Sequence, residues 1–136
     1  MLSDQDFTSA TAIQRKMYTS LNEVSDLTDE LSQAVSRQDQ VAVRMFLSMR
    51  LEEIQRLTSY QAILQRQCAQ LPPEDSKLLT QLNSGRFQGD APTPSAQALL
   101  QQAQRNRTVL ERVRRADQAV SRRLGGSNSF YNRKGK

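Results

Sequence analysis

The sequence of 136 residues contains no histidine, no tryptophan and a single cysteine, Cys68. One cysteine cannot form an internal disulfide. Without histidine, and with Cys68 placed among apolar helix positions, the usual combinations of nucleophile, base and metal ligands are missing. No glycine-rich loop of the kind that binds phosphate is present either. We therefore expect no enzymatic activity, no cofactor and no metal.

Long apolar runs are absent as well. The densest apolar segments, residues 41–43 and 45–47, are far shorter than the roughly 20 residues that a membrane-spanning helix needs. Residues 1–4 do not show the basic segment followed by an apolar one that marks a secretory signal. We expect a soluble cytoplasmic protein without a transmembrane segment.

Aromatic residues are scarce, at 5% of the chain, and hydrophobic residues make up 37%. Glutamine and arginine are abundant instead, which suits amphipathic helices better than β-strands. A chain of 136 residues is large enough for one modest core. The composition therefore favours one helical domain.

Apolar residues recur at alternating spacings of three and four, the pattern of a helix with one buried face. The first such segment covers residues 6–35, and a polar break at 36–39 separates it from a second, 39–71, which Pro72 and Pro73 end. A short helix at 73–82 and a loop at 83–94, rich in glycine and proline, precede the last helix, 95–124, which Gly125 and Gly126 stop.

These segments predict an all-α fold, in which a long antiparallel helical hairpin and a third C-terminal helix form a three-helix, coiled-coil-like bundle. The single helical domain is expected to occupy residues 1–126. A flexible basic tail is expected at residues 127–136 because this segment is too polar to pack.

The second long helix carries two apolar stripes. The stripe that we expect to face the first helix comprises Val43, Leu47, Leu51, Ile54, Leu57, Leu64, Cys68 and Leu71. A second stripe, roughly opposite in the first half of this helix, consists of Ala42, Met45, Phe46 and Met49. This half is either buried between two other helices, which is the interpretation that we favour, or partly exposed for a partner.

The last helix has a continuous stripe that two polar residues, Asn106 and Asp117, interrupt. A buried polar side chain without a hydrogen-bond partner costs about 1 to 3 kcal/mol, so each of the two needs a partner or a role. Either both are satisfied within a stable bundle, or the helix is a binding element in which polar positions fix the register. On the second interpretation the candidate client-binding residues are Leu99, Asn106, Leu110, Val113, Asp117, Val120 and Leu124.

Charge is distributed unevenly along the chain, whose formal net charge is +5. Residues 1–100 contain nine Lys or Arg and twelve Asp or Glu, a net of −3, whereas residues 101–136 contain ten and two, a net of +8. The arginines of the last helix could form a solvated face, a docking surface for an acidic protein or a nucleic-acid site. They are spread around the helix, and no aromatic residue lies among them to stack on bases, so we do not expect nucleic acid as the partner.

The layout resembles the FlgN-type flagellar export chaperones, small bacterial proteins built from long antiparallel helices. The features that carry the resemblance are the polar break Arg37-Gln38-Asp39-Gln40, the loop, the spacing of Asn106, Arg107 and Leu110, and the ending Ser129-Phe130-Tyr131-Asn132-Arg133-Lys134-Gly135. This ending is similar to the family's close of an aromatic residue, Tyr, Asp, two variable residues and Gly, with Asn132 in place of the more usual Asp.

The resemblance implies a cytoplasmic chaperone that binds hook-associated (hook-filament junction) proteins by their amphipathic terminal helix before export by the flagellar type III secretion apparatus. Its C-terminal helix would bind this client. Tyr131, with Phe130 beside it, matches the position that docks on the export gate in the family. We expect a monomer or a weak dimer. The alternatives are another helical secretion chaperone or adaptor of FliT type, a structural coiled-coil oligomer subunit, and a basic nucleic-acid-binding helical protein.

Overall fold

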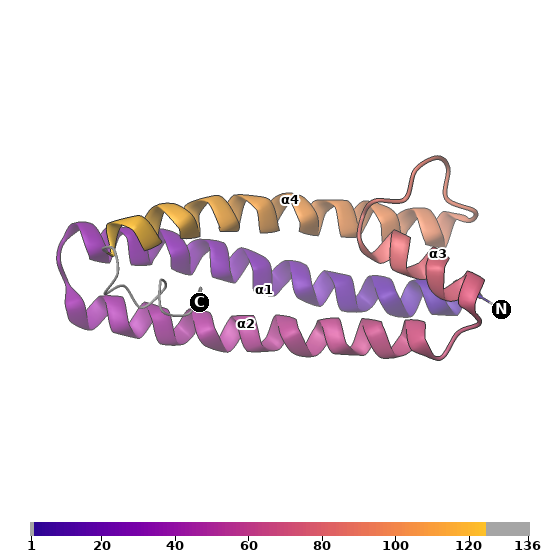
Figure 1. Ribbon diagram of the computed structural model, residues 1–136, viewed down its shortest axis with the longest axis horizontal. Coiled ribbons are helices and arrows are strands. Elements are labelled where there is room, and N and C mark those ends of the chain that lie inside the picture. The colour runs from indigo at the N-terminus through magenta and orange to yellow at the C-terminus, as the bar shows by residue number, and fades with distance from the viewer. Residues whose placement is uncertain (1, 125–136) are drawn as a thin grey trace.

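The structure is a computed structural model that describes residues 2–124 (Figure 1). Over this range the chain forms helices and no strand, which confirms the all-α class. The helices are α1 (Asp4–Ser36), α2 (Gln40–Ala69), α3 (Pro73–Asn83) and α4 (Pro94–Arg123). None of these four is both long enough and apolar enough to cross a membrane.

Capping side chains fix where the long helices begin. Ser3 and Asp6 form a capping box at the start of α1, in which each side chain accepts a hydrogen bond from the backbone N–H of the other residue. The Asp39 carboxylate and the Thr93 hydroxyl each accept a hydrogen bond from a backbone N–H in the first turn of α2 and α4. Pro73 opens α3, where a missing N–H costs nothing because no helical partner exists there.

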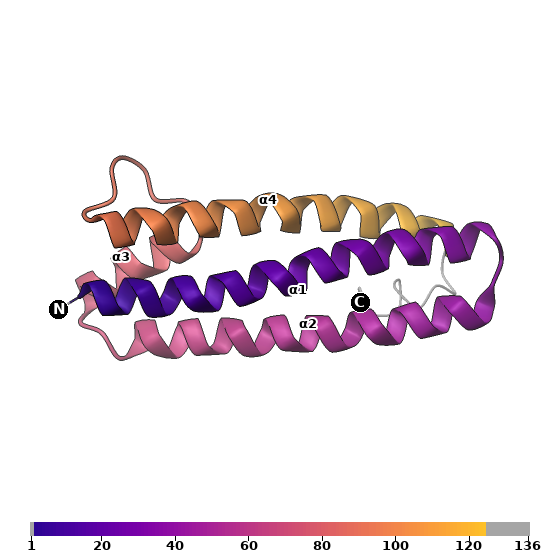
Figure 2. The same ribbon diagram turned by 180° about the vertical axis from the view of Figure 1, so that it is seen from behind.

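Helix α1 lies in the middle of the bundle, with α2 packed along one side of it and α4 along another (Figures 1 and 2). A tight turn at residues 37–39 makes α2 antiparallel to α1. In contrast, α4 is parallel to α1, because Ser95 contacts Asp4 at one end of the pair and Arg123 contacts Ser32 at the other. The backbones of α2 and α4 do not come close to each other. The bundle is therefore open along the side where α2 and α4 face each other across α1.

Most of the core lies between α1 and α4. One cluster, beside α3, contains Phe7, Ala10, Leu64, Leu79, Leu82, Ala96, Leu99 and Leu100, and the other contains Leu21, Val24, Val109 and Val113. Only Arg50 and Leu64 of α2 are fully buried. Helix α2 is thus attached to the bundle through one narrow face.

The stripe that the sequence assigned to the core side of α2 is partly wrong. Leu51 and Ile54 are both 41% exposed, while Leu57 is half-buried against the second core cluster. The physical reason is that the backbone of α2 comes close to only one long helix, α1, so no helix of residues 2–124 covers the flank that carries Leu51 and Ile54. The apolar stripe of α2 is wide enough to pack against two long helices, but only α1 lies along it.

The favoured interpretation of the first half of α2, as a segment buried between two helices, is also wrong. Met45 is 50% exposed and Met49 is 41% exposed, although Ala42 and Phe46 are half-buried. These methionines lie on a side of α2 that no other helix of the described chain covers. The alternative interpretation, partial exposure, fits the structure.

Helix α3 closes one end of the bundle with Leu79 and Leu82, both 0% exposed. The loop that follows it turns sharply at Gly85, where φ is +73°. A Cβ atom at Gly85 would lie 3.3 Å from the backbone of Ala103 in α4. The close approach of the loop to α4 therefore requires glycine at this position.

Candidate helix-binding groove

A groove of about 840 Å³ lies between α2 and α4, next to α3. Met17 and Leu21 of α1 form its floor, and α3 bounds it with polar side chains that include Thr80 and Asn83. The apolar side chains on its walls are Ile54, Leu57, Leu64 and Cys68 from α2, and Ala103 and Leu110 from α4. The groove exists because α2 and α4 both pack on α1 while their backbones stay apart.

The two rims of the groove differ in charge. Arg107 and Arg114 stand on the α4 rim, and Arg86 joins them from the loop after α3. The acidic residue on this rim is Glu111, whose carboxylate lies 3.8 Å from Nε of Arg107. The α2 rim carries neutral polar side chains, namely Thr58, Gln61 and Gln65. An anionic partner would therefore be attracted to the α4 rim.

Beyond the groove, one ion pair connects α2 to α4. Nη2 of Arg50 donates to Oδ1 of Asp117 at 2.8 Å, with side chains that are 4% and 32% exposed. A buried guanidinium is expensive to desolvate, so it is held in the interior by the carboxylate opposite. This pair fixes the distance between two helices that have no backbone contact.

Asn106 is the centre of a buried hydrogen-bond network. Its Nδ2 donates to the backbone oxygen of Gln14 at 2.8 Å and to the side-chain Oε1 of Gln14 at 2.7 Å. Its Oδ1 accepts from Gln102 at 3.1 Å. The amide of Gln14 in turn donates to Asn83, which ties α4, α1 and α3 together at the base of the groove.

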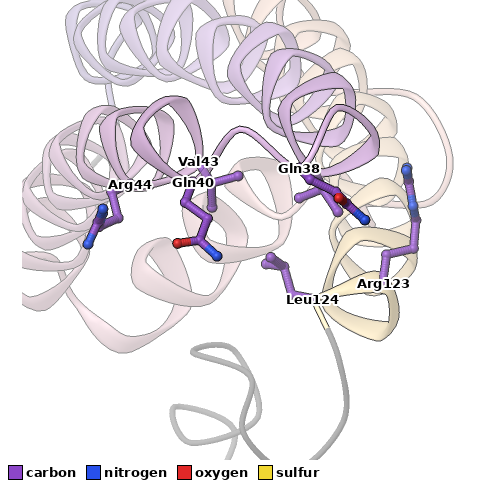
Figure 3. A pocket seen from close by; sticks show the side chains of 7 residues that line it. Gln38, Gln40, Val43, Arg44, Arg123 and Leu124 are labelled. Carbon is purple, nitrogen blue, oxygen red and sulfur yellow. The ribbon is translucent and has the colours of Figure 1, made fainter.

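A second hollow, of about 540 Å³, continues the space between α2 and α4 beyond the Arg50–Asp117 pair. Figure 3 shows Gln40, Val43 and Arg44 from the start of α2 on one side, and Leu124 at the end of α4 on the other. Arg123 donates to Ser32 and Ser36 of α1. This hollow also has a cationic border.

The outer flank of α4 carries a different set of arginines. The guanidinium of Arg105 lies over the ring of Tyr18 in α1, 4.7 Å from its centroid. The pKa of the Tyr18 phenol is lowered, first by a hydrogen bond with the Asn22 side chain, and further by the hydrogen bond and charge of Arg105 and the more distant charge of Arg112. Arg105 and Arg112 therefore belong to the side of α4 away from the groove.

The predicted client-binding residues of α4 fall into two groups. Leu99, Val113 and Val120 are 0%, 7% and 2% exposed and hold α4 in the bundle, and Asn106 is buried in its hydrogen-bond network. Leu110 lines the groove, Asp117 pairs with Arg50, and Leu124 lines the second hollow. The two predicted export-gate residues, Phe130 and Tyr131, lie outside the described residues.

Sequence reasoning missed Arg50, Gln14 and the walls that α2 contributes. A signal for Arg50 was present, because it stands seven residues after Val43 and seven before Leu57 and thus occupies a stripe position. A basic residue on one stripe and an acidic one on another can pair across a bundle. No comparable signal marks Gln14, because glutamine is also common on exposed helix faces.

Within residues 2–124, no three side chains of His, Cys, Asp or Glu gather in a way that could hold a metal ion. What the groove offers is apolar contact area and a cationic rim, which suit binding. No family model, curated protein or solved structure matches this chain. The groove is therefore the feature of this chain that bears on its function.

Proposed function

We propose that this protein is a chaperone that holds an amphipathic helix of a partner protein in the groove between α2 and α4. The observation that carries the proposal is that two helices flank α1 and leave an apolar strip between them uncovered, with Ile54 41% exposed at its edge. A helix of the partner laid on this strip would form a four-helix arrangement with the long helices α1, α2 and α4. Its apolar face would cover Ile54, Leu57 and Leu110.

A helix fits this groove better than an extended segment does. The walls are helices, whose backbone N–H and C=O groups are already bonded within each helix. They offer no edge on which an extended strand could pair its own backbone groups. A helical partner satisfies its backbone internally and needs only an apolar face, which is the helix-in-groove mode of recognition.

The charges of the rims predict the charge pattern of the partner. Arg86, Arg107 and Arg114 on one rim favour acidic side chains along that flank of the bound helix, while the α2 rim favours neutral polar ones. The chain's own residues 125–136 carry Arg133, Lys134 and Lys136 and no acidic residue. Charge therefore disfavours this tail as the occupant of the groove.

The resemblance to the FlgN-type chaperones supplies the identity of the partner within this proposal. The client is then a hook-associated protein, held by its amphipathic terminal helix in the bacterial cytoplasm until export, and Phe130 and Tyr131 serve the export gate. A chaperone of FliT type would differ only in its client. In either case the protein acts without catalysis, Leu110 contacts the client, and Leu99, Val113 and Val120 keep α4 on α1.

Two pairs of arginines on α4 with the same spacing test this proposal. The double variant Arg107→Glu with Arg114→Glu reverses the rim, and the double variant Arg105→Glu with Arg112→Glu makes the same change in net charge on the outer flank. We expect the rim variant to weaken binding of a peptide from the terminal helix of a hook-associated protein at least about tenfold, and the outer variant to bind as wild type does.

Isothermal titration calorimetry at physiological salt measures these affinities, and circular dichroism checks that both variants remain helical. Long-range attraction between net charges is screened at this salt, so only contacts at the rim should respond. Equal loss in the two variants would place binding outside the groove. If the wild-type chain binds none of the hook-associated peptides, the proposal that its client is a hook-associated protein is wrong. Peptides from other secreted helical proteins would then be tested.

A further inference from the structure

A second exposed apolar face lies on α2, outside the groove. Val41 is 73% exposed, Met45 50%, Met49 41% and Ile63 39%. None of these residues lines the groove or the second hollow. Exposed apolar side chains that follow one helix face in this way are typical of an interaction surface.

The face has the spacing of a coiled-coil seam. Alternating steps of four and three residues place its members in one line along α2, which we call the outer seam: Met45, Met49, Glu52, Arg56, Ser59 and Ile63. The seam is apolar at its two ends and charged in its centre. The order of apolar and charged positions is nearly the same from either end of the seam. A two-fold interface requires this, because it places each position opposite its counterpart from the other end.

We propose that the chain forms an antiparallel homodimer in which the outer seams of two copies pack against each other. Pairing Glu52 with Arg56 of the second copy fixes the register. Met45 then lies opposite Ile63 of the second copy, Met49 lies opposite Ser59, and the two-fold axis repeats each pair. The apolar ends meet each other, and every central charge meets an opposite one.

The charges select the antiparallel orientation. In a parallel dimer with the same seam, Glu52 would face Glu52 and Arg56 would face Arg56 of the second copy, which places like charges together. Arg56 contacts Glu53 of its own chain, with 2.5 Å between Nη1 and Oε2, but its side chain is 58% exposed. A guanidinium has five N–H donors, so it can bind Glu53 and an acidic residue of a second copy together.

The dimer leaves the groove open, because Ile54 and Leu57 lie on another flank of α2. Each dimer would therefore present two grooves. Two charged residues and a serine among the six seam positions predict a weak association, since polar seam positions reduce stability while specifying the register.

The test uses matched substitutions in the full chain. Met49 and Leu51 are both 41% exposed, and only Met49 belongs to the outer seam. Sedimentation equilibrium should show a wild-type mass that rises with concentration from 15.4 kDa toward twice that value. We expect Met49→Lys to raise the dimer dissociation constant at least about tenfold and Leu51→Lys to leave it within about twofold.

The charged centre is tested by reversal. Glu52→Arg and Arg56→Glu should each weaken the dimer, and the two together should restore it, because the double variant exchanges the charges without losing the pairs. A wild-type chain that stays monomeric up to millimolar concentration would overturn the proposal. So would a dimer that Met49→Lys does not affect, one that Leu51→Lys weakens equally, or a double variant that is not restored.

Discussion

Asn106 and Asp117 interrupt the apolar stripe of α4, and each has a partner on another helix. Asn106 bonds to Gln14 of α1, and Asp117 to Arg50 of α2. From the sequence, both could be residues satisfied inside a bundle or features of an exchanging helix. The hydrogen bonds show that the first possibility accounts for both in this structure.

The Arg50–Asp117 pair gives a prediction about stability. Asp117→Asn replaces the carboxylate that pairs with the buried Arg50 guanidinium by a neutral amide, and we expect the free energy of unfolding to fall by about 1.5 to 3 kcal/mol. Replacing both residues, Arg50→Met with Asp117→Leu, removes the buried charge as well, so this variant should be as stable as wild type or more stable. Urea unfolding followed by circular dichroism measures both.

A double variant less stable than Asp117→Asn would contradict this account, because it would mean that the pair contributes more than the cost of burying it. Arg107→Met is a suitable control. Within residues 2–124, the ion pair of Arg107 is a long contact of 3.8 Å with Glu111 on the exposed surface of α4, and we expect this substitution to change stability by less than about 0.5 kcal/mol.

At the scale of the helices, the all-α class followed from residues that are visible in the sequence. Alternating apolar spacing and the prolines before α3 act within a few residues of chain. The side of α2 that becomes exposed could not be predicted in this way. It depends on where α4 packs, and Leu51 and Ile54 would be core residues if α4 lay against α2 as well as α1.

The same limit applies to the groove. Its walls come from helices far apart in the sequence, such as Ile54 of α2 and Leu110 of α4, and their separation is a property of the packing. The sequence identified Leu110 as a candidate because it lies on a stripe. It did not distinguish Leu110 from Leu99 or Val113, which lie on the same stripe but are buried in the first and the second core cluster respectively.

The loop between α3 and α4 offers a test at this scale. Gly85 and Gly89 both have a positive φ, +73° and +89°, but only a Cβ at Gly85 would meet another segment, the backbone of Ala103 at 3.3 Å. Gly89→Ala should cost about 1 kcal/mol or less, the backbone penalty in an open loop, and Gly85→Ala about 1 to 2 kcal/mol or more.

Thermal unfolding of the two glycine variants, followed by circular dichroism, gives the comparison. The closing of the bundle by α3 requires the loop to approach α4 at Gly85, so the larger loss should occur there. If Gly89→Ala were the more destabilising of the two, the close approach at Gly85 would not be what holds the loop on α4.

For the whole molecule, the important feature is that α1 has two long neighbours whose backbones do not come close to each other. A closed three-helix bundle would bury the inner faces of all its helices and would have no place for a partner. Here α4 is attached to α1 by Leu99, Val113 and Val120, and the Arg50–Asp117 pair keeps α2 and α4 apart at a fixed distance. The groove is therefore already formed in the chain alone, which would lower the cost of binding the helix that we propose as its occupant.

The chain contains three isoleucines, and each lies in a different part of the molecule. Ile54 lines the groove, Ile63 lies on the outer seam, and Ile13 packs against the first core cluster. Selective labelling of isoleucine methyl groups therefore gives one NMR signal for the groove, one for the opposite flank of α2 and one for the interior.

The central claim, that the groove binds a partner helix, is tested most directly by adding the terminal-helix peptide of a hook-associated protein to this labelled chain. We expect the Ile54 methyl signal to shift with the peptide concentration until it saturates, while the signals of Ile63 and Ile13 stay where they are. A saturating shift of Ile63 with Ile54 unchanged would contradict this claim, because the peptide would then bind to the outer face of α2 and leave the groove empty.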